Sequence, residues 1–129
     1  MTRAAVGRYL DALNSGDPDT IAGCVAEEFF NEHTSALGHS GRGRAEYRAR
    51  LPGFLSSFAG LHYEVEEMIV DGPRAAVAYT MTFRYEGRPV SVRGVFRFRV
   101  EGGLIAHRVD YWDSAVFTQQ TTVNEAGPP

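Results

Sequence analysis

The ten residues Leu104–Asp113 (LIAHRVDYWD) combine ionisable and apolar side chains in a pattern that favours acid/base chemistry. If the segment is a β-strand, alternation places Arg108, Asp110 and Trp112 on one face. A carboxyl group beside an indole ring is partly removed from water, which raises its pKa and suits it to carrying a proton near neutral pH. Asp110 is therefore the leading catalytic candidate. The alternative is a structural ion pair between Arg108 and Asp110, which would lower the pKa of the carboxyl group and leave it only as a base.

His33 is a second candidate, because an imidazole titrates in the physiological range and can exchange a proton with a substrate. The short run of residues 29–33 is expected to be extended, with Phe29, Asn31 and His33 on one face. The alternative is a histidine at the edge of a loop that bonds a backbone carbonyl. We expect no metal and no cofactor, because no ligand spacing joins the four histidines, His33, His39, His62 and His107.

Helical spacing of apolar residues predicts three helices in the first half of the chain. The first ends at Asn14-Ser15-Gly16 and is indicated by Val6, Tyr9, Leu10 and Leu13. The second is capped by Asp17, begins at Pro18 and has an inward face of Ile21, Ala22, Cys24 and Val25. Residues 44–58 form the third, indicated by Tyr47, Leu51, Phe54, Leu55 and Phe58. Its Pro52-Gly53 pair is expected to break or kink it, residues 34–43 are expected to be a loop, and Cys24 a buried, inert thiol.

From Leu61 the apolar period becomes two, which predicts four strands in an antiparallel meander. In the first, Tyr63, Val65 and Ile69 share one face. The strand of residues 90–100 is the clearest, with one face made of Val90, Val92, Gly94, Phe96, Phe98 and Val100. Helices followed by strands are typical of an α+β domain whose helices cover one face of a bent sheet, and a pocket remains where the helices do not fill the curve.

Composition limits the function further. The chain has 129 residues and a net charge of -3, with thirteen basic residues scattered among sixteen acidic ones, so no nucleic-acid footprint is present. No apolar stretch approaches the roughly 20 residues of a membrane helix, and the first residues lack the core of a signal peptide. We therefore expect a cytoplasmic protein that binds neither membrane nor nucleic acid, with one domain over residues 1–117 and a polar, frayed tail over residues 118–129.

Three segments resemble the NTF2-like superfamily over residues 4–117: the opening RYLDALNSGDPDTIAGCVAEEF, the pair Gly43-Arg44, and the ending GVFRFRVEGGLIAHRVDYWD. Within it, the chain is most similar to SnoaL-like polyketide cyclases, ketosteroid isomerases and limonene epoxide hydrolases. The resemblance implies a cone-shaped curved antiparallel sheet wrapped around three N-terminal helices. It also implies a pocket inside the cone and a homodimer through the outer sheet face.

Carried over position by position, the resemblance implies that the pocket is lined by Tyr9, His33, Met81, Phe83, Phe96, Arg108, Asp110 and Trp112, with Tyr47 and Phe54 as further substrate contacts. Tyr9 matches the tyrosine that donates to the oxyanion in the isomerases. However, His33 stands where those enzymes have their aspartate base, and Gly94 where they have an acidic second donor.

The other two branches match differently. Asp110 falls on a catalytic aspartate of the epoxide hydrolases, but Met81 and Phe83 replace the arginine and aspartate of their earlier strand. The SnoaL-like cyclases match best, because they keep an aspartate at the position of Asp110 as acid/base, often with a histidine near that of His33.

These observations favour a cofactor-independent acid/base enzyme of isomerase, cyclase or lyase type that acts on a small apolar carbonyl compound, such as a polyketide or steroid-like molecule. Asp110 would carry the proton, and His33 or Tyr9 would stabilise the enolate oxygen. Two alternatives stay open: a non-catalytic domain that binds a small molecule, and a dimeric interaction module.

Overall fold

The computed structural model describes residues 1–122 of the chain, and residues 123–129 lie outside the described part. Four helices are α1 (Thr2–Ser15), α2 (Pro18–Ala22), α3 (Arg44–Ser57) and α4 (Ser114–Thr121). Six strands are β1 (Val25–His33), β2 (Gly41–Arg42), β3 (Ala59–Asp71), β4 (Arg74–Tyr85), β5 (Arg88–Glu101) and β6 (Leu104–Trp112).

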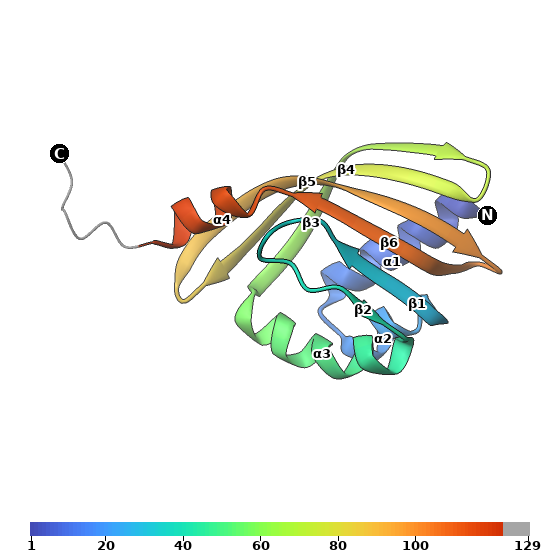
Figure 1. Cartoon of the computed structure of the whole chain (residues 1–129), viewed down its shortest axis with the longest axis horizontal. Coiled ribbons are helices and arrows are strands. Elements are labelled where there is room, and N and C mark those ends of the chain that lie inside the picture. Colours follow the sequence, from blue (N-terminus) through green and yellow to red (C-terminus); the bar gives the residue numbers. More distant parts are fainter. Residues whose placement is uncertain (123–129) are drawn as a thin grey trace.

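The strands form one curved, unclosed sheet in the order β2-β1-β6-β5-β4-β3, and helices α1, α2 and α3 lie on one side of it (Figure 1). The expected α+β class and the antiparallel meander from β3 to β6 are confirmed. The meander is not the whole sheet, because β1 pairs in parallel with β6. This pairing sets Asn31 opposite Arg108 and His33 opposite Asp110, so it joins residues from the two ends of the chain.

The predicted inward face of the second helix is wrong in its last two residues. Helix α2 ends at Ala22, and Val25 already belongs to β1, where it is fully buried opposite Ile105. Cys24 is only half-buried, and its thiol donates to the carbonyl of Thr20. Pairing with β6 and burial in the sheet therefore outweigh the helical spacing that predicted a longer helix.

The alternation predicted for β3 fails in its second half. The pairing of β3 with β4 shifts between Val65 and Glu67, so the side chains that follow change faces. Met68 and Val70 then pack against the core, while Ile69 points outward and is 59% exposed. Val65 is also exposed, because β3 is the outer strand of the sheet.

Helix α3 continues through Pro52 without a break. Proline removes only one backbone hydrogen bond there, and the burial of Tyr47 and Leu51 offsets that loss. The loop expected over residues 34–43 contains the short strand β2, which pairs with β1.

Helix α4 crosses the boundary expected between domain and tail, since it includes residues 118–121. It covers the part of β5 that extends beyond the pairing with β6, where Ser91 would otherwise lack a backbone partner on that side. The amide group of Gln120 accepts from the backbone N–H of Ser91 at 2.7 Å and donates to its carbonyl at 2.9 Å. Phe117 packs against the rings of Phe58, Phe83 and Tyr85, so the helix is fixed by polar and aromatic contacts together.

Candidate functional site

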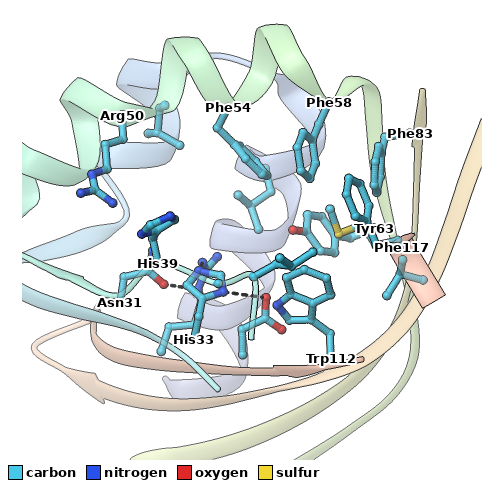
Figure 2. A pocket seen from close by; sticks show the side chains of 18 of the residues that line it. Asn31, His33, His39, Arg50, Phe54, Phe58, Tyr63, Phe83, Trp112 and Phe117 are labelled. Atoms are coloured by element: carbon cyan, nitrogen blue, oxygen red, sulfur yellow. Dashed lines mark hydrogen bonds and ion pairs between the residues drawn. The ribbon is translucent and has the colours of Figure 1, made fainter. Parts of the chain in front are cut away.

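A cavity of about 410 Å³ lies between the concave side of the sheet and helix α3 (Figure 2). Much of its wall is aromatic or aliphatic, including Leu51, Phe54, Phe58, Met81, Phe83, Val92, Trp112 and Phe117. Its polar wall residues include Asn31, His33, His39, Arg50, Arg108 and Asp110, and the tyrosines Tyr63 and Tyr79 also line it. The volume and the mostly apolar lining are those of a site for a small organic molecule.

Asp110 is a buried carboxyl group on this wall, with 4% of its surface exposed. The hydroxyl of Tyr79 donates to its Oδ1 at 2.5 Å. Burial raises the pKa of Asp110 above its usual value, against the opposing effects of the Arg108 charge and the Tyr79 hydrogen bond. The expected face of β6 is therefore found, and it places a buried carboxyl group with a raised pKa on the cavity wall.

Arg108 is also buried, with 6% of its surface exposed, and it forms no ion pair with any carboxylate of the described residues. Its Nε donates to Asn31 Oδ1 at 3.0 Å and its Nη1 to the hydroxyl of Tyr9 at 2.7 Å. Its Nη2 lies 3.3 Å from His33 Nε2. The structural ion pair between Arg108 and Asp110 that the sequence left open is thus absent.

His33 is held in one tautomer by its neighbours. A guanidinium group only donates, so His33 Nε2 accepts from Arg108 and the neutral ring carries its proton on Nδ1. Nδ1 faces Asp110 Oδ2 at 3.7 Å, too far for a hydrogen bond, and has no other partner in the described chain. Burial, the Arg108 charge and His39 lower the pKa of His33 to about 3. The expectation that this ring titrates in the physiological range is therefore wrong, since it stays neutral there.

The depressed pKa of His33 predicts a loss of stability in acid. Below pH 6.5 the unfolded chain protonates this ring while the folded protein resists down to about pH 3, so the stability present above pH 6.5 falls in that window. From pH 7 to pH 5 the free energy of unfolding of the parent should fall because of His33. In His33→Gln this fall should be smaller by about 2 kcal/mol. Urea titrations at the two pH values measure it. His62→Gln, at an exposed position, is the matched control and should leave the decrease unchanged. An equal decrease in His33→Gln and the parent would contradict the prediction.

Tyr9 and Phe96 do not line the cavity, contrary to the expectation. Tyr9 is fully buried behind Arg108, and its hydroxyl lies 2.6 Å from that of Tyr47. Phe96 is also fully buried, with the Arg108 guanidinium 5.0 Å from its ring centre. Both contact Arg108 but are not part of the cavity wall, to which their elements α1 and β5 contribute Leu13 and Val92 instead. The other expected pocket residues, Tyr47, Phe54, Met81, Phe83 and Trp112, do line it.

Tyr79 is the residue that sequence reasoning missed. Its hydroxyl reaches Asp110 by crossing β5 at Gly94, where an added Cβ atom would lie 2.4 Å from the Tyr79 oxygen. The only available signal was Gly94 itself, since a glycine inside an apolar strand marks the close approach of another group.

Two further observations concern other classes of function. In residues 1–122, no group of three or more His, Cys, Asp or Glu side chains is placed to hold a metal ion. None of the described helices has both the length and the apolar character needed to cross a lipid bilayer.

Comparison with known proteins gives a family match and a set of similar structures. The model of the SnoaL-like domain family matches residues 6–108. A Catenulispora acidiphila protein with a ketosteroid isomerase-like fold, solved in complex with trimethylamine, superposes with a TM-score of 0.86 at 16% identity and covers 100% of both chains. An epoxide hydrolase from M. tuberculosis, similar to the limonene enzymes, has a TM-score of 0.78 at 20% identity, over 91% of this chain and 86% of that one.

A third similar structure is a protein of Silicibacter sp. assigned as a polyketide cyclase. It superposes with a TM-score of 0.77 at 24% identity, over 95% of this chain and 96% of that one. At these identities the three structures establish the fold and leave the chemistry of the site to its own residues.

Proposed function

The chain belongs to the SnoaL-like domain family, and from this premise we propose that it is a cofactor-independent acid/base enzyme acting on a small apolar carbonyl compound. The reaction is of isomerase, cyclase or lyase type, and its first step is removal of a proton from a carbon next to the carbonyl group. Polyketide or steroid-like molecules are the substrate class. The polyketide cyclase assignment of a protein with the same fold supports this class.

The observation that carries the proposal is the state of Asp110. Tyr79 holds Oδ1, while Oδ2 accepts no hydrogen bond from the described residues and belongs to a side chain on the cavity wall. A carboxylate with a raised pKa and one free oxygen is a suitable base for a weakly acidic C–H bond. The aromatic wall excludes water, which protects the carbanion from the solvent.

Stabilisation of the enolate oxygen is assigned to His33. Its Nδ1–H has no partner, is buried and lies beside the Asp110 carboxyl group, so a small rotation of the ring towards the cavity lets a carbonyl oxygen accept from it. Tyr9, the other residue considered for this role, is too deep to reach a ligand and instead positions Arg108.

The experiment is proton exchange on 2-tetralone, a benzo-fused cyclic ketone with acidic C–H bonds, in D₂O followed by NMR. We expect the purified protein to accelerate exchange of the benzylic protons next to the carbonyl above the buffer rate. The second candidate, a non-catalytic binding domain, predicts that ketones change the fluorescence of Trp112, the single tryptophan, without any accelerated exchange.

Removing the Tyr79 hydroxyl should move the pH profile of this exchange. The hydrogen bond from Tyr79 lowers the pKa of Asp110, so Tyr79→Phe raises that pKa further. Because the base acts in its ionised form, the rising limb of the rate against pH should move up by about one pH unit. Tyr85→Phe, on the same strand and the same cavity wall, is the control and should leave the limb in place. An unshifted limb in Tyr79→Phe would show that this hydroxyl does not position the base.

The homodimer through the outer sheet face and the cytoplasmic location remain predictions. The outer face carries two partly exposed apolar side chains, Val95 and Tyr111, next to Arg97. Such residues support an interface but do not establish one.

A further inference from the structure

The polar end of the cavity contains a buried positive charge that no carboxylate neutralises directly. We propose that the ligand of this cavity is an amphipathic anion, with a flat apolar body and a delocalised anionic oxygen head that binds Arg108 and His33. The inference rests on the proposed function in that it concerns the same cavity, and it specifies the substrate class of that site.

The first support is the set of partners of Arg108. Three of its N–H groups go to neutral acceptors on Tyr9, Asn31 and His33. A guanidinium group has five N–H donors, and the described residues supply no hydrogen-bond acceptor for the others. Taking such a charge out of water is costly unless an anion pairs with it, and the planar fork of arginine suits two oxygens of one delocalised anion.

The second support is the distribution of chemistry along the cavity. Figure 2 shows Asn31, His33, His39 and Arg50 at one end, and Phe58, Phe83 and Phe117 at the other. The Nδ1–H of His33 adds an unused donor at the polar end. Arg50 is half-exposed and already pairs with Glu46 at 3.2 Å, so it contributes positive potential without being the specific contact.

A neutral apolar ligand fits this arrangement less well. Without an acceptor it would cover the unused N–H groups of Arg108 and His33 at a cost of about 1 to 3 kcal/mol for each buried donor, and a neutral carbonyl oxygen would accept from them more weakly than an anionic oxygen does. A cationic ligand would be repelled by the positive charge of Arg108. An anionic oxygen satisfies both donors, and the aromatic end then holds the rest of the molecule.

Trp112 allows a direct test, because it is the only tryptophan and lies on the cavity wall. Titration with 2-naphthoate and with 2-naphthamide at neutral pH compares an anion with a neutral molecule of nearly the same shape. We expect the naphthoate to bind tighter by at least about tenfold, since hydrogen bonds to charged groups are the stronger ones. Equal affinities of naphthoate and naphthamide, or binding of neither, would exclude a carboxylate head and leave only an enolate head for the second pair of probes to test.

A second pair of probes distinguishes two sources of the head group. 2-Hydroxy-1,4-naphthoquinone is an enolate at neutral pH, and its methyl ether is neutral. A preference for the anion in both pairs supports a general oxyanion site. A preference in the naphthoate pair alone assigns the head group as a carboxylate, and a preference in the naphthoquinone pair alone assigns it as an enolate. No preference in either pair overturns the inference.

Variants locate the charge. Arg108→Met should abolish the preference for naphthoate while the affinity for naphthamide changes by less than about threefold. Arg74→Met, at an exposed position, removes the same net charge and should keep the preference. Because Arg108→Met removes three hydrogen bonds and can unfold the protein, Asp110→Asn provides an independent measurement. It removes a neighbouring negative charge and should tighten naphthoate binding several-fold.

The two proposals fail separately. Accelerated ketone exchange without any preference for anions would overturn only this inference. A preference for anions without accelerated exchange would overturn only the proposed reaction.

Discussion

Asp110→Asn should slow the protein-dependent exchange of 2-tetralone protons by at least about a hundredfold, the usual contribution of a positioned general base. The amide is nearly the same size as the carboxyl group, and its oxygen can still accept from the Tyr79 hydroxyl. It cannot accept a proton from carbon. The variant therefore removes the proposed chemistry while it keeps the shape of the cavity.

The same variant should not be less stable than the parent at neutral pH. Since the folded pKa of Asp110 is raised, the folded protein holds this proton more tightly than the unfolded chain does, and stability falls as pH rises through the folded pKa. Asparagine avoids that cost. Thermal unfolding measures it. Asp113→Asn is the matched control for both measurements, because this exposed aspartate directly follows the same strand and asparagine can also make its capping hydrogen bond to Ala115 N–H. Full exchange activity in Asp110→Asn would refute the assigned role.

Gly94→Ala should destabilise the protein by about 2 to 3 kcal/mol, as expected for an overpacked core. The added Cβ would lie 2.4 Å from the Tyr79 oxygen and 2.8 Å from the backbone carbonyl oxygen of Tyr111. The tyrosine could swing away, but the carbonyl belongs to β6, whose register with β5 pairs Gly94 with Trp112. The strain therefore has to be absorbed by the sheet beneath the site.

Two measurements check this prediction. Urea titration gives the loss of stability, and the exchange assay should show the shift in pH profile expected for Tyr79→Phe, because the displaced hydroxyl no longer reaches Asp110. Gly7→Ala is the matched control. Gly7 lies within helix α1 and has no atom near an added Cβ, so alanine there should stabilise by about 0.5 to 1 kcal/mol. A Gly94→Ala protein as stable as the parent would mean that the close approach of Tyr79 is not required.

Local alternation was sufficient to place part of the site. The pattern of β6 puts Arg108, Asp110 and Trp112 on the cavity wall, because the side-chain period of a strand depends on nothing outside the strand. The same reasoning assigned the buried face of β5. It failed in β3, where a shift in register reverses the faces halfway along.

The interactions between strands could not be predicted from the sequence and became visible only in the folded structure. The parallel pairing of β1 with β6 joins segments about 75 residues apart, and no local signal near His33 indicates it. The neutral state of His33 follows from burial and from the charge of Arg108, neither of which is visible in its own sequence neighbourhood. The depth of Tyr9 likewise depends on how helix α1 packs against the sheet.

The attachment of helix α4 separates two properties of the site. The charged and titratable groups of the cavity wall include residues of β1 and β6, while the aromatic end of the cavity is completed by Phe117 on helix α4, which Gln120 ties to Ser91. Changes in this helix can lengthen or shorten the space for a ring system without moving Asp110 or Arg108. In the proposed reaction, the size of the ring system that fits and the groups that transfer the proton are therefore set by different parts of the chain.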